Sequence, residues 1–236
     1  MHKKIRFYIS PFFLSRYYIS KDIRYFIEKY GFRGTVLDLG CGEKPYKYLF
    51  KNSKYLGIDF PKYSINKDFK GEKPDHYFTD DYKETLVLPF PDEYFDNAVS
   101  FQVLEHHKRP DLMIGEMARV IRKGGLVLLT CPFIGGLHEE PNDFQRYTKY
   151  KLRELFEKNN CEIIGGKKEG SLPSVISMLI NEHISSFAAK NKFCYFLASL
   201  IYLPFLLFQY LSLLLDKIIR SEKIFINYMI LVRKTQ

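Results

Sequence analysis

A strand pattern that ends in an acid and a glycine turn most strongly limits how this chain can fold. Residues 35–40 read Thr-Val-Leu-Asp-Leu-Gly, and the next two residues are Cys41 and Gly42. Because glycines lack side chains, Gly40 and Gly42 let the backbone bend sharply and let a ligand approach it. A strand followed by such a turn and a helix is typical of doubly wound α/β sheets, which bind ligands at the carboxyl ends of their strands.

Strand and helix patterns alternate along the rest of the chain. Further strands are expected at 55–60, 75–80, 95–101, 126–132, 161–167 and 226–234. Helices are expected at 14–30, from 45 to 52, at 109–125 with Gly124 closing the helix, and at 148–160 with Thr148 as the cap. This order predicts a Rossmann-like, doubly wound α/β fold. Its seven-stranded sheet is mostly parallel, and the last strand is antiparallel.

Composition limits the class of protein. The chain has 236 residues, 46% of them hydrophobic, so it can bury one sizeable core. Its formal charge of +9 favours an anionic partner such as nucleic acid, a membrane face or a phosphorylated substrate, and also suits a basic soluble enzyme. The four cysteines have neither zinc-site nor disulfide-framework spacing, so we expect no metal and a cytoplasmic location. The apolar runs near the N-terminus are too short for a signal peptide.

The glycine turn alone leaves two kinds of cofactor open. Asp59 ends the second strand, where a carboxylate can accept hydrogen bonds from both ribose hydroxyls. A dinucleotide fingerprint would have a third glycine at position 45, but this chain has Pro45, which also removes a backbone N–H from the helix start. An NAD-dependent oxidoreductase therefore stays an alternative at this point.

Residues 88–132 carry a more specific pattern. It consists of an Leu88-Pro89-Phe90 approach with Asp92 and Phe95-Asp96, a Leu104-Glu105-His106 turn, a helix with Glu116 and Arg119-Val120, and a Gly124-Gly125 turn. In order and spacing this stretch resembles the class I S-adenosylmethionine (SAM) dependent methyltransferases, specifically the type 11 group. With the glycine turn, the resemblance covers roughly residues 33–170 and fits the closing strand at 226–234. Within the motif, a structural ion pair is the simpler role for Glu116 and Arg119.

The resemblance implies a set of SAM-binding residues. Asp38, Gly40 and Gly42 would line the methionine end, with Asp38 near the ammonium, and Asp59 would hold the ribose hydroxyls. Either Asp80 or Asp81 would accept from the adenine amino group. Residues Gln102, Val103 and Leu104 would run under the cofactor. SAM carries cationic groups and no phosphate, which suits carboxylates better than a phosphate loop.

The segment 131–148 is expected to shape the methyl-acceptor pocket. Some type 11 relatives have a similar stretch, which here consists of His138, Pro141, Asp143, Arg146, Tyr147 and Thr148. His138 is the first candidate for a general base and His106 the second, because histidine can accept a proton near neutral pH. A backbone-bonded loop histidine is the alternative for His138. Asp143, Arg146 and Tyr147 are candidate substrate contacts, and a salt bridge that pins the loop is the alternative for the first two.

An uncharged segment at 193–215 is long enough to span a bilayer as a helix, and it has basic residues on both sides. A single crossing would separate the last strand from its neighbours, so we expect a helical hairpin bent at Pro204. The hairpin would mediate peripheral membrane contact or homodimerisation. The predicted domains are an N-terminal helical cap (1–32), a SAM-binding domain (33–171 and 224–236) and a hydrophobic helical insertion (172–223).

Together these features predict a SAM-dependent methyltransferase, located in the cytoplasm or at the inner face of the membrane. The expected acceptor is a hydroxyl on a small molecule, such as a glycan, a lipid-linked intermediate or a quinone-like ring. Nucleic acid is a weaker expectation because no aromatic platform is interleaved with basic residues. A catalytically inactive, membrane-associated scaffold of the same fold is a further alternative.

Overall fold

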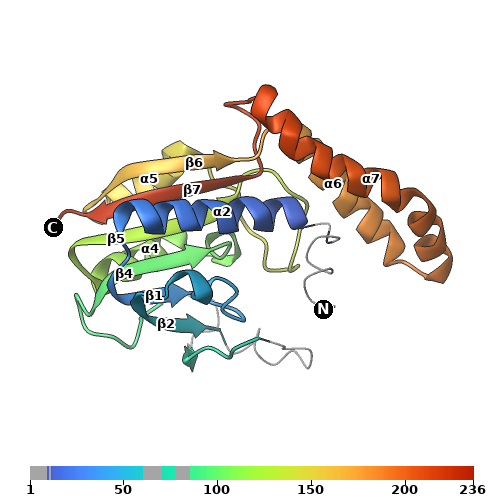
Figure 1. Ribbon diagram of the computed structural model, residues 1–236. Helices are drawn as coiled ribbons and strands as arrows, with labels where there is room; N and C mark the ends of the chain where they lie inside the picture. The colour runs from blue at the N-terminus through green and yellow to red at the C-terminus, as the bar shows by residue number, and fades with distance from the viewer. Residues whose placement is uncertain (1–9, 11, 61–70, 78–85) are drawn as a thin grey trace. The chain divides into compact units, whose positions relative to one another are not determined.

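A computed structural model describes residues 10, 12–60, 71–77 and 86–236 (Figure 1). In the described residues, seven strands form one sheet in the order β3-β2-β1-β4-β5-β7-β6. The strands are β1 (Gly34–Leu39), β2 (Ser53–Asp59), β3 (His76–Tyr77), β4 (Phe95–Phe101), β5 (Ile121–Pro132), β6 (Cys161–Glu169) and β7 (Asn227–Lys234). The sheet is mixed, with β7 antiparallel, which confirms the predicted Rossmann-like α/β fold.

The sheet reverses its direction of winding between β1 and β4. From β1 the chain adds β2 and then β3 on one side, and it returns to β4 on the other side of β1. The β1–β2, β1–β4, β2–β3 and β4–β5 pairs are all parallel. Parallel strands end at the same edge, so the loops after β1 and β4 diverge from neighbouring points and leave a crevice where ligands bind in such sheets.

The central strands are apolar because both faces of the sheet are covered. The β5 residues Leu126 to Leu129 are all buried, as expected for a strand inside a parallel sheet. The helices of this region are α2 (Phe13–Tyr30), α4 (Pro110–Val120) and α5 (Lys149–Glu157). In Figure 1, α4 and α5 lie behind the sheet and the second half of α2 lies in front of it.

Two predicted helix boundaries are wrong. The helix expected from residue 45 is only a 3-10 turn, η1 (Lys47–Leu49), because β2 begins at Ser53 and leaves no room for a longer helix. The helix expected to close at Gly124 ends at Val120, since Ile121 is extended and pairs with Phe95 of β4. The predicted cap of α5 is confirmed: the Thr148 side chain accepts a hydrogen bond from the backbone N–H of Lys151.

The chain divides into two compact units, which are described separately. The larger unit comprises residues 22–131, 139–167 and 229–236, and holds most of the sheet. The smaller unit comprises residues 132–138 and 168–228 together with the N-terminal residues up to Lys21. These boundaries differ from the predicted domains, whose division stays a prediction.

The smaller unit is built around helices α6 (Leu172–Ala188) and α7 (Lys192–Ile218), which lie side by side in Figure 1. The hairpin turn lies at residues 189–191, and α7 continues as one helix through Pro204. The predicted hairpin at Pro204 is therefore wrong: the partner of α7 is α6. An apolar cluster that includes Phe13, Val175 and Ile226 packs the base of α6 against the start of α2 and of β7.

Asp216 near the end of α7 ties the two helices together. Its carboxylate accepts hydrogen bonds from the backbone N–H of Ser171, at 3.0 Å, and of Ser174, at 3.2 Å. It also accepts one from the Tyr18 hydroxyl at 2.6 Å. Asp216 thus caps the N-terminus of α6, a position where backbone N–H groups lack helical partners.

Candidate active site

A buried carboxylate lies at the carboxyl end of β1. Asp38 is 2% exposed, and the Tyr55 hydroxyl donates to its Oδ2 atom. Its other oxygen, Oδ1, is buried and has no hydrogen-bond partner among the described residues. Burial and the charge of Asp59 raise the pKa of Asp38 to about 7, although the Tyr55 hydrogen bond and Lys44 act in the opposite direction. A buried carboxylate oxygen without a donor favours a ligand that brings a cation or an N–H group.

The glycine turn after β1 packs directly on the loop after β4. Gly40 has a φ of +77°, and a Cβ added there would lie 2.4 Å from the Val103 side chain. A residue with a side chain would therefore be both strained and sterically blocked at this position. Gln102, which is next to Val103, has a φ of +57° and hydrogen-bonds to Thr130 of β5 through its side chain and its backbone N–H. These contacts bring the predicted cofactor residues of β1 and β4 together.

Asp59 at the end of β2 joins the same group. Its Oδ2 accepts the Gly42 backbone N–H at 2.5 Å, and its Oδ1 accepts that of Phe60 at 2.6 Å. Burial raises the pKa of Asp59, with the Glu139 charge adding to this effect and the two backbone hydrogen bonds opposing it. Each carboxylate oxygen can accept a second hydrogen bond, so Asp59 keeps the capacity to hold a ligand's hydroxyls.

Two residues of this region were missed by the sequence analysis. Tyr55 orients Asp38, and Lys44, whose side chain is 2% exposed, pairs with Asp75 at 2.7 Å. The strand pattern could have indicated Tyr55. Alternate residues of a strand share a face, so Tyr55, four residues before Asp59, lies on the same face as Asp59. The parallel register of β1 and β2, which pairs Asp38 with Gly57, then brings the tyrosine within reach of Asp38. No sequence pattern indicated Lys44.

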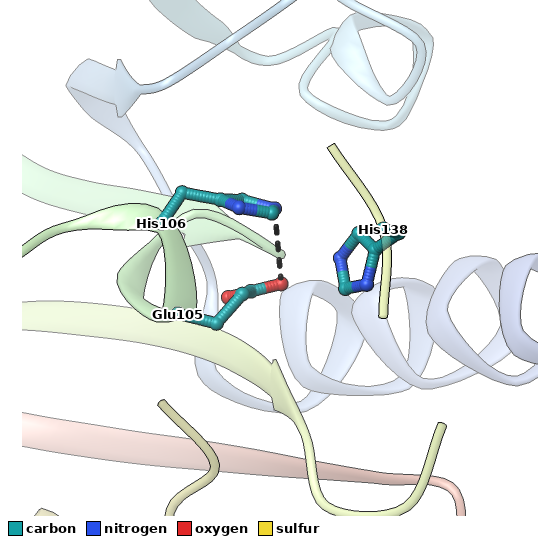
Figure 2. A group of neighbouring side chains, drawn as sticks. All are labelled: Glu105, His106 and His138. Atoms are coloured by element: carbon teal, nitrogen blue, oxygen red, sulfur yellow. Dashed lines mark ion pairs between the residues drawn. The ribbon is translucent and has the colours of Figure 1, made fainter. Parts of the chain in front are cut away.

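A short turn after β4 holds Glu105 and His106, both buried (Figure 2). His106 Nδ1 lies 2.6 Å from the backbone carbonyl of Asn142. A carbonyl can only accept, so Nδ1 carries the proton and Nε2 is the acceptor nitrogen of the neutral ring. Nε2 lies 3.8 Å from Glu105 Oε1 and 3.9 Å from Glu139 Oε2. The turn therefore presents a histidine with a defined tautomer beside two carboxyl groups.

The loop after β5 holds this turn in position. Besides the His106 contact, the backbone N–H of Phe144 donates to the Glu105 carbonyl, and the Gln145 side chain donates to the His107 carbonyl. The Tyr147 hydroxyl donates to the Leu104 carbonyl at 3.0 Å. Tyr147 is only 1% exposed, and its hydrogen bond fixes the turn that carries His106. A substrate contact of its side chain stays a prediction.

The remaining predicted site residues lie in different parts of the chain. Asp143 and Arg146 form a two-pronged ion pair at 2.5 and 2.8 Å, with the Asp143 side chain almost fully buried. This is the loop-pinning salt bridge considered as their alternative role. His138, also drawn in Figure 2, belongs to the smaller unit, where its Nδ1 lies 3.2 Å from the Gly136 carbonyl. Asp80 and Asp81 lie outside the described residues.

The motif residues of the larger unit have structural roles. Arg119 pairs with Glu116 and Asp92 at 2.7 and 2.8 Å and donates to the Leu88 and Phe90 carbonyls. This confirms the structural ion pair expected for Glu116 and Arg119. Asp96 accepts from the Thr35 backbone and hydroxyl, which joins the start of β4 to β1.

The fold and these residues define a class: an α/β domain with two buried carboxylates, Asp38 and Asp59, at the carboxyl ends of β1 and β2. Residues 37–129 match the family model described as a methyltransferase domain. This match supports a class I SAM-dependent methyltransferase, a class whose cofactor is SAM. The family match favours this class over the NAD-dependent oxidoreductase.

Known proteins are similar over part of their length. The chain is 32% identical to a tRNA (carboxymethyluridine(34)-5-O)-methyltransferase from Arabidopsis thaliana, over 52% of this chain and 30% of that protein. It is also 32% identical to a phosphatidylethanolamine N-methyltransferase from Cereibacter sphaeroides, over 42% of this chain and 51% of that protein. The chain thus spans about half or less of these curated relatives.

A solved structure shares the fold. It is phosphoethanolamine N-methyltransferase 2 from Haemonchus contortus in complex with SAM, with a TM-score of 0.54 and 17% identity. The match covers 92% of this chain and 53% of that one. At this identity the likeness shows the fold alone.

Proposed function

We propose that this chain transfers the methyl group of SAM to a hydroxyl of a small-molecule acceptor. The observation that carries the proposal is the buried Oδ1 of Asp38, which lacks a donor at the carboxyl end of β1. The α-ammonium of SAM would supply the missing donor and a positive charge. In the same glycine turn, a Cβ at Gly42 would meet only Asp59 Oδ2, at 4.0 Å, so this part of the backbone is open to close approach.

The remaining proposed cofactor contacts rest on the family resemblance and on the ends of β2 and β4. Asp59, held by two backbone N–H groups, would accept the ribose hydroxyls, and residues 102–104 would line the floor. Asp80 or Asp81 would accept from the adenine amino group. When bound, SAM supplies an activated methyl on a sulfonium centre, and the protein's contribution is to hold the acceptor in line and to take its proton.

We assign the general base to His106 in preference to His138. The Asn142 carbonyl sets the tautomer of His106, so Nε2 is the nitrogen that can accept a proton. Glu105 and Glu139 lie within 4 Å of Nε2 and would stabilise the imidazolium formed when the acceptor hydroxyl loses its proton. His138, whose ring nitrogen faces the Gly136 carbonyl, is the second candidate.

Two residues of the loop after β5, Asp143 and Arg146, support an acceptor site. Asp143 holds Arg146 in one orientation, and the Arg146 side chain keeps about a quarter of its surface exposed. A fixed guanidinium with exposed surface suits an anionic or hydroxyl-rich acceptor. A glycan, a lipid-linked intermediate or a quinone-like ring fits this description.

The relatives act on different acceptors, one on tRNA and one on phosphatidylethanolamine by their names. A lipid-linked acceptor is favoured here because α7 exposes a broad apolar surface. The proposed location is the cytoplasm, at the inner face of the membrane. Nucleic acid ranks below it, as the scattered tyrosines form no evident stacking platform.

Labelled methyl transfer from SAM to a panel of lipid-linked and soluble sugars tests the proposal. His106→Asn keeps a donor near the Asn142 carbonyl but removes Nε2, so turnover should fall by about 10²- to 10⁴-fold while SAM affinity is unchanged. His138→Ala is the matched comparison and should lower turnover less. Unchanged turnover in His106→Asn and a large loss in His138→Ala would move the base to His138. Wild-type protein that binds SAM and methylates nothing in the panel would favour the inactive scaffold.

A further inference from the structure

Helix α7 buries small and polar residues and exposes large apolar ones, which is the reverse of a helix in a soluble protein. Its buried residues are all small or polar: Cys194, Ala198, Gln209 and Ser212. No Phe, Leu or Ile of α7, which the structure describes completely, is buried. A soluble amphipathic helix buries its apolar stripe and exposes polar residues. By length and composition, α7 could cross a membrane. Only 17% of its most apolar 18-residue stretch is buried by the rest of the protein, so α7 is not a core helix.

The polar residues of the hairpin are collected between the two helices. Ser174, Ser177 and Asn181 of α6 are fully buried, as are the two polar residues of α7. The Ser174 and Ser212 hydroxyls lie 3.3 Å apart, and the Asn181 amide donates to the Ser177 carbonyl at 2.9 Å. Small and polar residues at helix contacts, with large apolar residues outside, are typical of helices surrounded by lipid.

The outward surface of α7 is strongly apolar over most of its length. The most exposed large side chains are Phe193, Tyr195, Phe196, Leu200, Leu203, Leu207, Leu214 and Ile218, each between 57% and 80% exposed. At 100° per residue, all of these except Tyr195 lie within about 80° of one another. Adding the less exposed Leu197, Ile201, Tyr210 and Leu211, at 37% to 48%, widens the apolar surface to about half of the helix circumference. A two-fold dimer contact would need one self-complementary face, whereas a lipid environment accepts such a broad surface.

Basic residues mark both ends of this surface. Lys190 and Lys192 lie at the start of α7, and Lys217, Arg220 and Lys223 at its end, all of them exposed. Long basic side chains at the ends of an apolar helix suit the level of anionic headgroups. Negative charge on the membrane would therefore complement both ends of α7 at once.

The tip of the hairpin opposes insertion across the bilayer. Lys190 lies in the turn between the helices and Lys192 is the first residue of α7, so a crossing would carry two charges through the lipid. At 1.5 Å per residue α6 spans only about 25 Å, less than the roughly 30 Å hydrocarbon core. A helix lying in the interface, with charges at both ends, avoids these costs.

We propose that the α6–α7 hairpin is a membrane-attachment device, and that α7 lies in the headgroup region of an anionic membrane surface. The proposal rests on the smaller unit alone and does not depend on methyl transfer. It replaces homodimerisation as the role of residues 193–215.

Because the chain contains no tryptophan, a single introduced tryptophan reports on one position. In the otherwise unchanged 236-residue chain, the emission of Phe196→Trp should shift to the blue with vesicles containing phosphatidylserine, and much less with pure phosphatidylcholine. Tyr150→Trp, at a site on α5 that is 69% exposed against 58% for Phe196, is the control, and its emission should not shift. Lipids brominated near the headgroup should quench Phe196→Trp more strongly than lipids brominated deep in the chain.

Vesicle co-sedimentation adds a second measurement. Replacing Lys190 and Lys192 by Gln should weaken binding to the anionic vesicles by on the order of tenfold or more. No blue shift of Phe196→Trp with anionic vesicles would overturn the proposal. Self-association through residues 193–215 in that case would assign the surface to a second copy of the chain. Strongest quenching by the deep bromines would overturn the interfacial arrangement.

Discussion

The crevice of the larger unit and the hairpin of the smaller unit both bury polar groups, but with opposite surroundings. In the crevice, Asp38 is buried among apolar strands and one of its oxygens lacks a donor. In the hairpin, the buried serines are near one another and the apolar side chains face outward. From this difference we infer that the crevice receives a small cationic ligand and that the hairpin has an apolar environment.

The largest expected effect on stability comes from a substitution in the glycine turn of the crevice. Gly40→Ala places a Cβ 2.4 Å from the Val103 side chain on a backbone with φ of +77°. Overpacking and left-handed strain together should lower the free energy of unfolding by about 3 kcal/mol, as measured by urea denaturation. Cofactor binding should weaken as well, because the two loops that form the crevice meet here.

Gly124→Ala is the control for Gly40→Ala. Gly124 has nearly the same φ, +78°, but nothing lies within 4 Å of the added Cβ. Gly124→Ala should lower the free energy of unfolding by only about 1 kcal/mol. The difference between the two variants therefore isolates the Val103 contact. Equal losses in both would contradict the close packing of the two loops.

The second effect concerns the hairpin. Asp216→Ala removes the acceptor for two backbone N–H groups at the start of α6 and for the Tyr18 hydroxyl. It should destabilise the protein by about 2 kcal/mol, with faster hydrogen exchange in α6. Glu222→Gln, which breaks an exposed ion pair with Lys168 in the same unit, is the control, and its cost should stay below about 0.5 kcal/mol. Similar values for both would remove the capping role of Asp216.

A smaller effect is expected from pH. The pKa of Asp38 in the ligand-free protein is raised to about 7, and a cationic ligand favours its charged form. Between pH 5.5 and 7 the affinity for S-adenosylhomocysteine should rise, by up to about tenfold per unit, as binding requires less proton release. The same raised pKa makes unfolding of the ligand-free protein easier as pH rises from about 4 to 7, since the unfolded carboxyl ionises first.

Calorimetric titrations across this range check the pH prediction. Asp38→Asn should remove most of the dependence, and Asp59, whose pKa is also raised, accounts for any remainder. A wild-type affinity that falls with rising pH would contradict the sign of the argument.

Much of the crevice could be predicted because it depends on local patterns. The strand before Asp38, the glycine turn and the acid at Asp59 follow one another within single strand-turn units. What could not be predicted depends on contacts between distant segments. The loop around Tyr147 is a hundred residues from β1, and its burial against the Leu104 carbonyl leaves no trace in the spacing of its motif.

The hairpin was only half predictable for the same reason. Composition identified residues 193–215 as unusually apolar, and Pro204 suggested a bend. The partner helix α6 reads as an ordinary mixed segment, because its serines and Asn181 show their role only when paired with α7. The arrangement of polar residues between the helices and apolar residues outside belongs to the pair, and it cannot be predicted from either helix alone.

Binding of S-adenosylhomocysteine to the wild-type protein and to Asp38→Asn, measured by titration calorimetry at pH 7.5 with NAD as comparison, tests the central claim most directly. The account predicts that the wild type binds the adenosyl ligand and not NAD. It predicts that Asp38→Asn binds at least about 30-fold more weakly, although its ligand-free form unfolds at the same temperature or higher. Equal affinity in the two proteins, or wild-type binding of NAD alone, would contradict it.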